Sequence, residues 1–205
     1  MSLTDSPSPP SPSDLYFLTD YPAPYWSGYS LPASELVMYL GPDTCCLLKS
    51  LPLLSSPQPQ AILDLCSGSG VQGLTLAKIA GSPSITLVDV NPRASKFASF
   101  NCALNQVKAD LHLVNANLLD PAQVSSLIPP STPECSVTVT ANPPFVPDAA
   151  PSSQPLYTTA GRRGDEVRTA EERGILLSLP SSLLTFHLSL RSSPFLLLLS
   201  PRFST

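Results

Sequence analysis

A glycine-rich turn between a short apolar run and a helical pattern is the feature that most limits how this chain can fold. Residues Ala61–Leu65 form the apolar run, and Gly68, Gly70 and Gly73 follow it in the spacing G-x-G-x-x-G. Such a run is typical of a strand, and the glycines allow the backbone to turn tightly and approach a ligand closely. The sequence therefore predicts a strand, a ligand-binding turn and a helix in direct succession.

The alternation of strand and helix continues on the C-terminal side of this turn. We expect one helix over Val71–Ala80, and a second that Asn91 caps with Pro92 in its first turn. Further strands are predicted at Ile85–Val88, Leu111–Val114 and Val137–Thr140. Because strands that alternate with helices form parallel sheets, we predict an α/β, Rossmann-like fold with a mainly parallel sheet.

Two acidic side chains indicate which ligand the turn binds. Asp89 ends the second predicted strand, where a carboxylate can accept the ribose hydroxyls of an adenosine; a helix-entry cap is its alternative role. Asp64 precedes the glycines, where it would repel the pyrophosphate of a dinucleotide. It would instead favour the cationic end and sulfonium of S-adenosylmethionine (SAM). The charge favours SAM, and an NAD-dependent oxidoreductase stays the alternative that the glycine spacing alone supports.

The NPPF motif, Asn142-Pro143-Pro144-Phe145, directly follows the fourth predicted strand. A neutral NH2 on an aromatic ring or an amide is a poor nucleophile, because its lone pair is delocalised. The Asn142 side-chain oxygen and the Pro143 carbonyl can accept its two N–H groups and direct the lone pair at a methyl group. The prolines stiffen the loop, and Phe145 offers a face for stacking. The motif predicts N-methyl transfer; a proline-rich turn without function is the alternative.

Together these motifs resemble the methyltransferase small domain family. The resemblance extends from about Tyr39 to Glu166 and rests on the segments YLGPDTCCLL, DLCSGSGVQGL, VDVNPRASKFASFN and ANPPFVP. The family includes glutamine methyltransferases of release factors and amino-group methyltransferases of rRNA and tRNA. It implies a class I SAM-dependent methyltransferase whose substrate is RNA or protein. It also implies a catalytic set of Asn142, Pro143, Pro144 and Phe145, and SAM contacts at Asp64, Gly68, Gly70 and Asp89.

The chain departs from the family in two places. Where the family often has an acidic residue near the adenine amino group, this chain has Asn117, whose amide oxygen can accept the same hydrogen bond. After Glu172 the chain becomes rich in Ser and Leu, without a clear alternation of strand and helix. This end supplies either a degraded helix and strand or nothing of the family's sheet. An incomplete sheet would favour a partner subunit, and a non-catalytic, truncated module that binds a partner is the alternative function.

Four segments follow from these observations. Residues 1–13 are rich in Ser and Pro and are expected to be disordered, because they offer nothing to bury. Residues 14–55 are expected to form an arm and a helix that starts near Asp43 or Thr44 and runs through Leu51. The SAM-dependent domain is predicted at 56–173 and an atypical tail at 174–205.

Composition limits the remaining classes. The net charge of −4 weakens an interaction with nucleic acid without excluding it. Five cysteines without a CxxC pair, and two histidines remote from any ligand cluster, predict no metal site and no disulfide framework. No apolar run approaches the roughly 20 residues of a membrane span, and the N-terminus resembles no signal or transit peptide. We expect a cytoplasmic enzyme.

Overall fold

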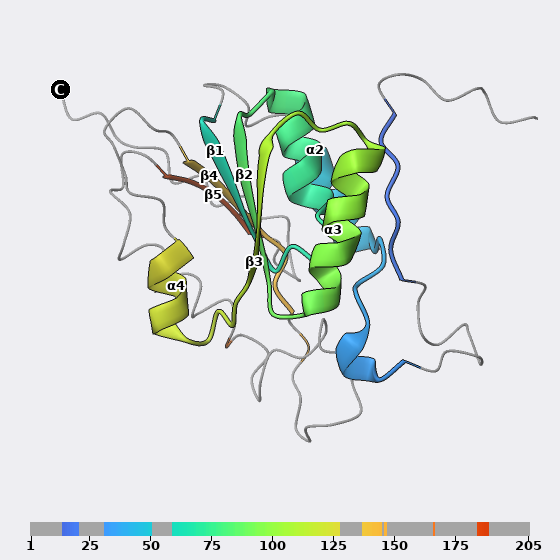
Figure 1. Ribbon diagram of the computed structural model, residues 1–205, viewed down its shortest axis with the longest axis vertical. Coiled ribbons are helices and arrows are strands. Elements are labelled where there is room, and N and C mark those ends of the chain that lie inside the picture. The colour runs from blue at the N-terminus through green and yellow to red at the C-terminus, as the bar shows by residue number, and fades with distance from the viewer. Residues whose placement is uncertain are drawn as a thin grey trace, which may run out of the picture.

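A parallel sheet forms the centre of this computed structural model, which describes residues 14–20, 31–50, 59–127, 137–144, 146, 166 and 184–188. The strands are β1 (Ala61–Leu65), β2 (Ser84–Asp89), β3 (Asp110–Asn115), β4 (Val137–Ala141) and β5 (Leu184–Leu188). Their order is β3-β2-β1-β4-β5, and every pairing is parallel (Figure 1). The order changes direction between β1 and β4, and ligands of open α/β sheets bind at such a point, outside the carboxyl ends of the strands.

Helices cover both faces of this sheet. They are η2 (Ala33–Glu35, a 3-10 helix), α1 (Pro42–Ser50), α2 (Val71–Ala80), α3 (Pro92–Leu104) and α4 (Pro121–Leu127). Helices α2 and α3 lie on one face and α4 lies on the other (Figure 1). The predicted α/β, Rossmann-like architecture is confirmed. Among the described residues, no helix has the length and apolar character needed to cross a membrane.

Two hydrophobic layers hold the helices against the sheet. Successive side chains of a strand point to opposite faces, so Ile62 packs in the layer under α2 and α3 while Leu63 and Leu65 pack in the opposite layer. All three are almost completely buried. Asp64 has the parity of Ile62, and its carboxylate therefore lies under α2, within hydrogen-bond distance of that helix.

Local signals explain where α2 and α3 begin and end. The Asn91 side chain caps α3 by accepting a hydrogen bond from the Arg93 N–H at 2.9 Å, and Pro92 occupies the first helical turn. Gly81 ends α2 in the left-handed conformation, with φ at 63°. Both helices were predicted from these residues. Helix α1 has the expected position and ends at Ser50, the last residue described in that range.

Strand β5 is an element that the sequence pattern did not reveal, and helices α4 and η2 were not predicted either. The strand comes from within the stretch predicted as an atypical tail, and it pairs in register with β4 from Val137↔Leu184 to Ala141↔Leu188. Pairing satisfies backbone groups of β4 that would otherwise form an open edge. The tail therefore contributes a strand to the sheet. The remainder of the tail and residues 1–13 lie outside the described residues.

Candidate functional site

A cavity of about 240 Å³ opens at the carboxyl ends of the parallel strands. Residues from five parts of the chain line it: 36–40 with Thr44, 66–72 without Gly70, 89–94 in part, 116–119, and Asn142 with Pro144. The loops after β1, β2, β3 and β4 thus converge on one space. This is the position at which α/β sheets bind ligands, and the sequence motifs meet there.

The glycine turn forms the floor of the cavity, although its glycines do different things. Gly68 lies in the cavity wall with φ at 53°, and its N–H donates to Asp89 Oδ2 at 2.8 Å. Gly70 faces the core instead, with φ at 79°, and a Cβ there would lie 3.0 Å from a methyl carbon of Leu74. A Cβ on Gly73 would lie 2.8 Å from the Cβ of Asp64. Gly70 and Gly73 therefore allow close helix packing, and Gly68 faces the ligand space.

Asp89 is held firmly at the cavity by backbone donors. Its Oδ2 accepts the Gly68 N–H at 2.8 Å and its Oδ1 accepts the Asn91 N–H at 2.9 Å. Burial raises the pKa of Asp89, and these hydrogen bonds oppose that rise. The Val90 backbone also hydrogen-bonds to this carboxylate, and a carboxylate has about four lone-pair sites, so Asp89 can still accept a hydroxyl group from a ligand. Asp89 thus lies in the cavity wall in a fixed orientation, and its contact with a ribose stays a prediction.

Asp64, a predicted SAM contact, lies beneath the turn and is not part of the cavity wall. Its side chain is completely buried, and Oδ2 accepts the Gly73 N–H at 2.9 Å. Burial raises the pKa of Asp64 to about 8, with a further contribution from the charge of Asp89. A carboxyl with this pKa is mostly protonated at neutral pH. The geometry assigns Asp64 to the support of the turn, and its direct contact with SAM stays a prediction.

Asn117 lines the cavity, as the predicted adenine contact requires, but part of its hydrogen-bonding capacity is used locally. Its Oδ1 accepts the Leu119 N–H at 3.0 Å, and its own N–H donates to Gln123 Oε1 at 2.9 Å. One lone pair of Oδ1 stays available to an amino group. The neighbouring Asn115 donates to the carbonyls of Asp89 and Val90, both at 2.8 Å. Asn115 therefore ties the end of β3 to the loop after β2.

Asn142 lines the cavity. Its side chain is buried, and Nδ2 donates to Asp43 Oδ2 at 3.1 Å and lies 3.5 Å from Thr44 Oγ1. The buried Oδ1 has no hydrogen-bond partner among the described residues. Pro144 lines the cavity, whereas Pro143 is buried outside its wall. Phe145, the fourth predicted catalytic residue, lies outside the described residues.

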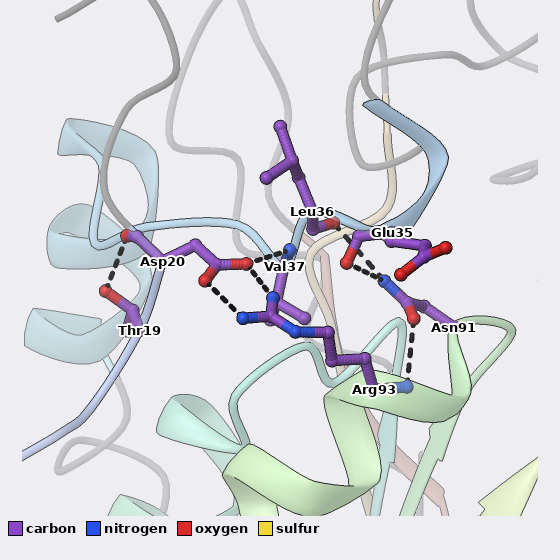
Figure 2. Close-up of polar contacts among 7 residues, drawn as sticks. All are labelled: Thr19, Asp20, Glu35, Leu36, Val37, Asn91 and Arg93. Carbon is purple, nitrogen blue, oxygen red and sulfur yellow. Dashed lines mark hydrogen bonds and ion pairs between the residues drawn. The ribbon is translucent and has the colours of Figure 1, made fainter. Parts of the chain in front are cut away.

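One wall of the cavity, residues 36–40, was not found by the sequence analysis. Figure 2 shows the polar contacts around its first two residues, Leu36 and Val37. Asn91 Nδ2 donates to the carbonyls of Glu35 at 3.1 Å and Leu36 at 3.3 Å. Asp20 Oδ2 accepts the Val37 N–H at 2.8 Å. The same carboxylate binds the Arg93 guanidinium in a bidentate ion pair, with Nη2 2.8 Å from Oδ1. Residues from α3 and from the N-terminal segment thus fix this wall.

The N-terminal segment 14–20 is itself anchored on α3 by two asparagines (Figure 1). Asn105 exchanges hydrogen bonds with the backbone of Tyr16 at 2.8 and 2.7 Å. Asn101 does the same with Leu18, at 2.8 and 2.9 Å, and also donates to the Ser69 carbonyl in the glycine turn at 2.9 Å. Each amide thus pairs with both an N–H and a carbonyl of the segment, as a neighbouring strand would. This pairing fixes the position from which Asp20 contacts the cavity wall.

The described residues contain no cluster of side chains that could bind a metal ion. No group of three or more His, Cys, Asp or Glu side chains lies close enough there to hold a metal ion. His112 lies 3.2 Å from Asp110, and both side chains are largely exposed. Cys45, Cys46, Cys66 and Cys102 are free thiols. The side chains that line the cavity carry a carboxylate, amides, hydroxyls and the Cys66 thiol.

Comparison with known proteins identifies relatives of the same kind. The family model described as methyltransferase small domain matches residues 41–155, more than half of the chain. The chain is 35% identical over 85 residues to the release factor glutamine methyltransferase of Thermodesulfovibrio yellowstonii, which covers 42% of this chain and 27% of that protein. It is 32% identical over 106 residues to the ribosomal protein L11 methyltransferase of Shouchella clausii, with coverage of 47% and 33%.

A comparison with solved structures also matches part of each chain. TrmN from Thermus thermophilus matches with a TM-score of 0.48 at 19% identity, over 69% of this chain and 37% of that one. The chain spans about a quarter to a third of the length of the two curated relatives. The family match includes the glycine turn and the loop after β4, since residues 41–155 contain both.

Proposed function

Because the chain belongs to the methyltransferase small domain family, we propose that it transfers the methyl group of SAM to a planar amino or amide nitrogen. The observation that carries this proposal is the Asn142 side chain. Its NH2 group is bound by Asp43, which leaves the buried Oδ1 as an acceptor without a partner among the described residues. A buried acceptor of this kind costs free energy unless a ligand donor satisfies it.

The residues of the cavity fit SAM. Asp89 offers carboxylate oxygens to the ribose hydroxyls, and Asn117 offers an amide oxygen to the adenine amino group. The apolar side chains of Leu36, Val90 and Leu118 line the same space and suit a flat base. When bound, SAM supplies an electrophilic methyl group on a sulfonium. These contacts support the cofactor assignment that the family carries.

Asn142 would act on the nucleophile. By accepting an N–H of the substrate, Oδ1 holds the nitrogen in one orientation. In this orientation the nitrogen lone pair points toward the methyl group and is less delocalised into the conjugated system. Pro143 and Pro144 limit the movement of the loop, so the acceptor is aimed before the substrate arrives. Near-attack geometry places the nitrogen about 3 Å from the methyl carbon. The proton can leave the methylated nitrogen afterwards, so a separate general base is not required.

The charge of the cavity supports a protein amide over an RNA base as the substrate. Among the described residues that line it, Asp89 is ionisable and no lysine or arginine is present. Binding to a phosphate backbone depends on such cations. The names of the two curated relatives also refer to protein substrates, a release factor and ribosomal protein L11. We propose a glutamine or asparagine side chain as the acceptor, with an RNA amino group as the alternative.

Methyl transfer from SAM with a tritiated methyl group tests this function. Purified release factor and ribosomal protein L11 serve as protein acceptors, and unmodified tRNA and rRNA transcripts as RNA acceptors. We expect label on a protein amide. Asn142→Ala should abolish transfer and leave the dissociation constant for SAM, measured by calorimetry, within about twofold. Asp110→Ala, which alters an exposed carboxylate far from the cavity, is the matched control.

The outcomes separate the alternatives. Transfer that survives Asn142→Ala would contradict the role of Asn142. Binding of SAM without transfer to any acceptor would favour a non-catalytic module that binds a partner. Binding of NAD in place of SAM would overturn the cofactor assignment.

A further inference from the structure

We infer that Asp43 is a positioning residue that orients the Asn142 amide, and that the segment Gly41–Thr44 is built around this contact. The inference rests on the proposed function, since it assigns the group that aims the acceptor. The two residues are 99 positions apart in the sequence, and both lie within the family match over residues 41–155.

The contact fixes the orientation of the Asn142 amide. A carboxylate accepts hydrogen bonds and does not donate them, so Asp43 Oδ2 selects the Nδ2 end of Asn142 at 3.1 Å. Thr44 Oγ1 lies 3.5 Å from the same nitrogen and is buried in the cavity wall. Both neighbours therefore lie on the NH2 side. The Oδ1 side is left for the N–H of a substrate.

Without this carboxylate the amide can rotate by 180° about its terminal torsion, which is a soft, nearly two-fold torsion. In the rotated form, Nδ2 would take the position of Oδ1. The NH2 group of Asn142 would then point at the NH2 group of the substrate. Two donors would then face each other, and the substrate lone pair would not be aimed. Asp43 would thus act on the reaction through Asn142 and without touching the substrate.

Gly41 provides the space that the Asp43 side chain occupies. A Cβ at position 41 would lie 2.5 Å from Asp43 Oδ1 and 3.3 Å from Cε of Met38. Gly41 directly precedes helix α1, and its carbonyl accepts the Cys45 N–H at 3.0 Å. Any side chain at this position would push the carboxylate away from its present place. A glycine directly before Pro42 therefore follows from the position of the carboxylate.

A purely structural role for Asp43 predicts a different result, so the two can be distinguished. An acid in the first turn of α1 also stabilises the helix dipole, and its loss would lower stability without a specific effect on turnover. Asp43→Ala removes both the charge and the acceptor. Asp43→Asn removes the charge but keeps a side-chain oxygen that can accept from Asn142 Nδ2.

The experiment compares Asp43→Ala, Asp43→Asn and the control Asp110→Ala in the full chain. We expect Asp43→Ala to lower kcat by about 10- to 100-fold, the range for a misaligned reacting group, with the dissociation constant for SAM within about twofold. Asp43→Asn should restore kcat to within about fivefold of the unaltered protein. Equal loss in both Asp43 variants, or full turnover in Asp43→Ala, would overturn the inference.

A second readout needs no substrate. The side-chain NH2 signals of Asn142 can be assigned in a ¹H–¹⁵N spectrum by their loss in Asn142→Ala. Asp43→Ala should move them to the positions of a solvent-exposed amide, whereas Asp110→Ala should leave them in place. If these signals respond to Asp43 and no methyl transfer is found, the proposed function fails while the positioning contact stands. If they do not respond, the positioning role fails even where transfer is observed.

Discussion

Removal of the Asp20 carboxylate would test how the wall of the cavity is held. In Asp20→Ala the guanidinium of Arg93 loses a bidentate partner, and the buried Val37 N–H loses its acceptor. Breaking a buried pair costs about 3–5 kcal/mol, and losing the acceptor of a buried amide costs about 1–3 kcal/mol. The Arg93 side chain is 27% exposed and its guanidinium lies 4.7 Å from the centroid of the Phe97 ring, so water and the ring compensate in part.

We therefore expect Asp20→Ala to reduce the free energy of unfolding by about 2–4 kcal/mol in urea denaturation. The wall of residues 36–40 should loosen with it, so the dissociation constant for SAM should rise by about tenfold, equivalent to ~1.4 kcal/mol. Asp20→Asn, which keeps an acceptor for Val37, should lose less stability. An Asp20→Ala protein within about 0.5 kcal/mol of the original, with unchanged SAM affinity, would refute this account of the wall.

Two further predictions concern the glycine turn. Burial raises the pKa of Asp64 from 3.8 to about 8, so between these values the native state binds the additional proton. The free energy of unfolding should fall as pH rises from 5 to 8, by up to about 1.4 kcal/mol per unit, and urea denaturation of Asp64→Asn should show a smaller slope. Cys66 has φ at 52°, where a Cβ is unfavourable, so Cys66→Gly should be about 1 kcal/mol more stable than Cys66→Ala. Equal slopes, or equal stabilities of the two Cys66 variants in urea, would contradict these predictions.

The sequence reveals the elements whose signals are local. The glycine turn, the Asn91-Pro92 cap and the Gly81 helix end each lie within a few residues of the structure that they specify. These signals place four of the strands and helices α2 and α3, whereas α4, which lies between β3 and β4, was not predicted. They also bring Gly68, Asp89 and Asn142 to one cavity, because the carboxyl ends of parallel strands share an edge.

The contacts that the sequence does not reveal join distant residues. Asp20 and Arg93 are 73 positions apart, and no spacing rule connects an acid in the N-terminal segment with a helix start. The position of Asp64 could have been derived from alternation in β1, because Ile62 and Asp64 share a face. Strand β5 carries no turn signal, and its pairing depends on the open edge of β4.

The attachment of segment 14–20 to α3 has a consequence for where the functional unit begins. The family match starts at residue 41, so a shortened protein beginning there would retain every recognisable motif. It would lack Asp20, which binds the Val37 N–H, and also all of residues 36–40. The smallest piece able to enclose a ligand is therefore larger than the matched segment, because Asn101 in α3 and Asn105 directly after it bind backbone groups from outside that segment.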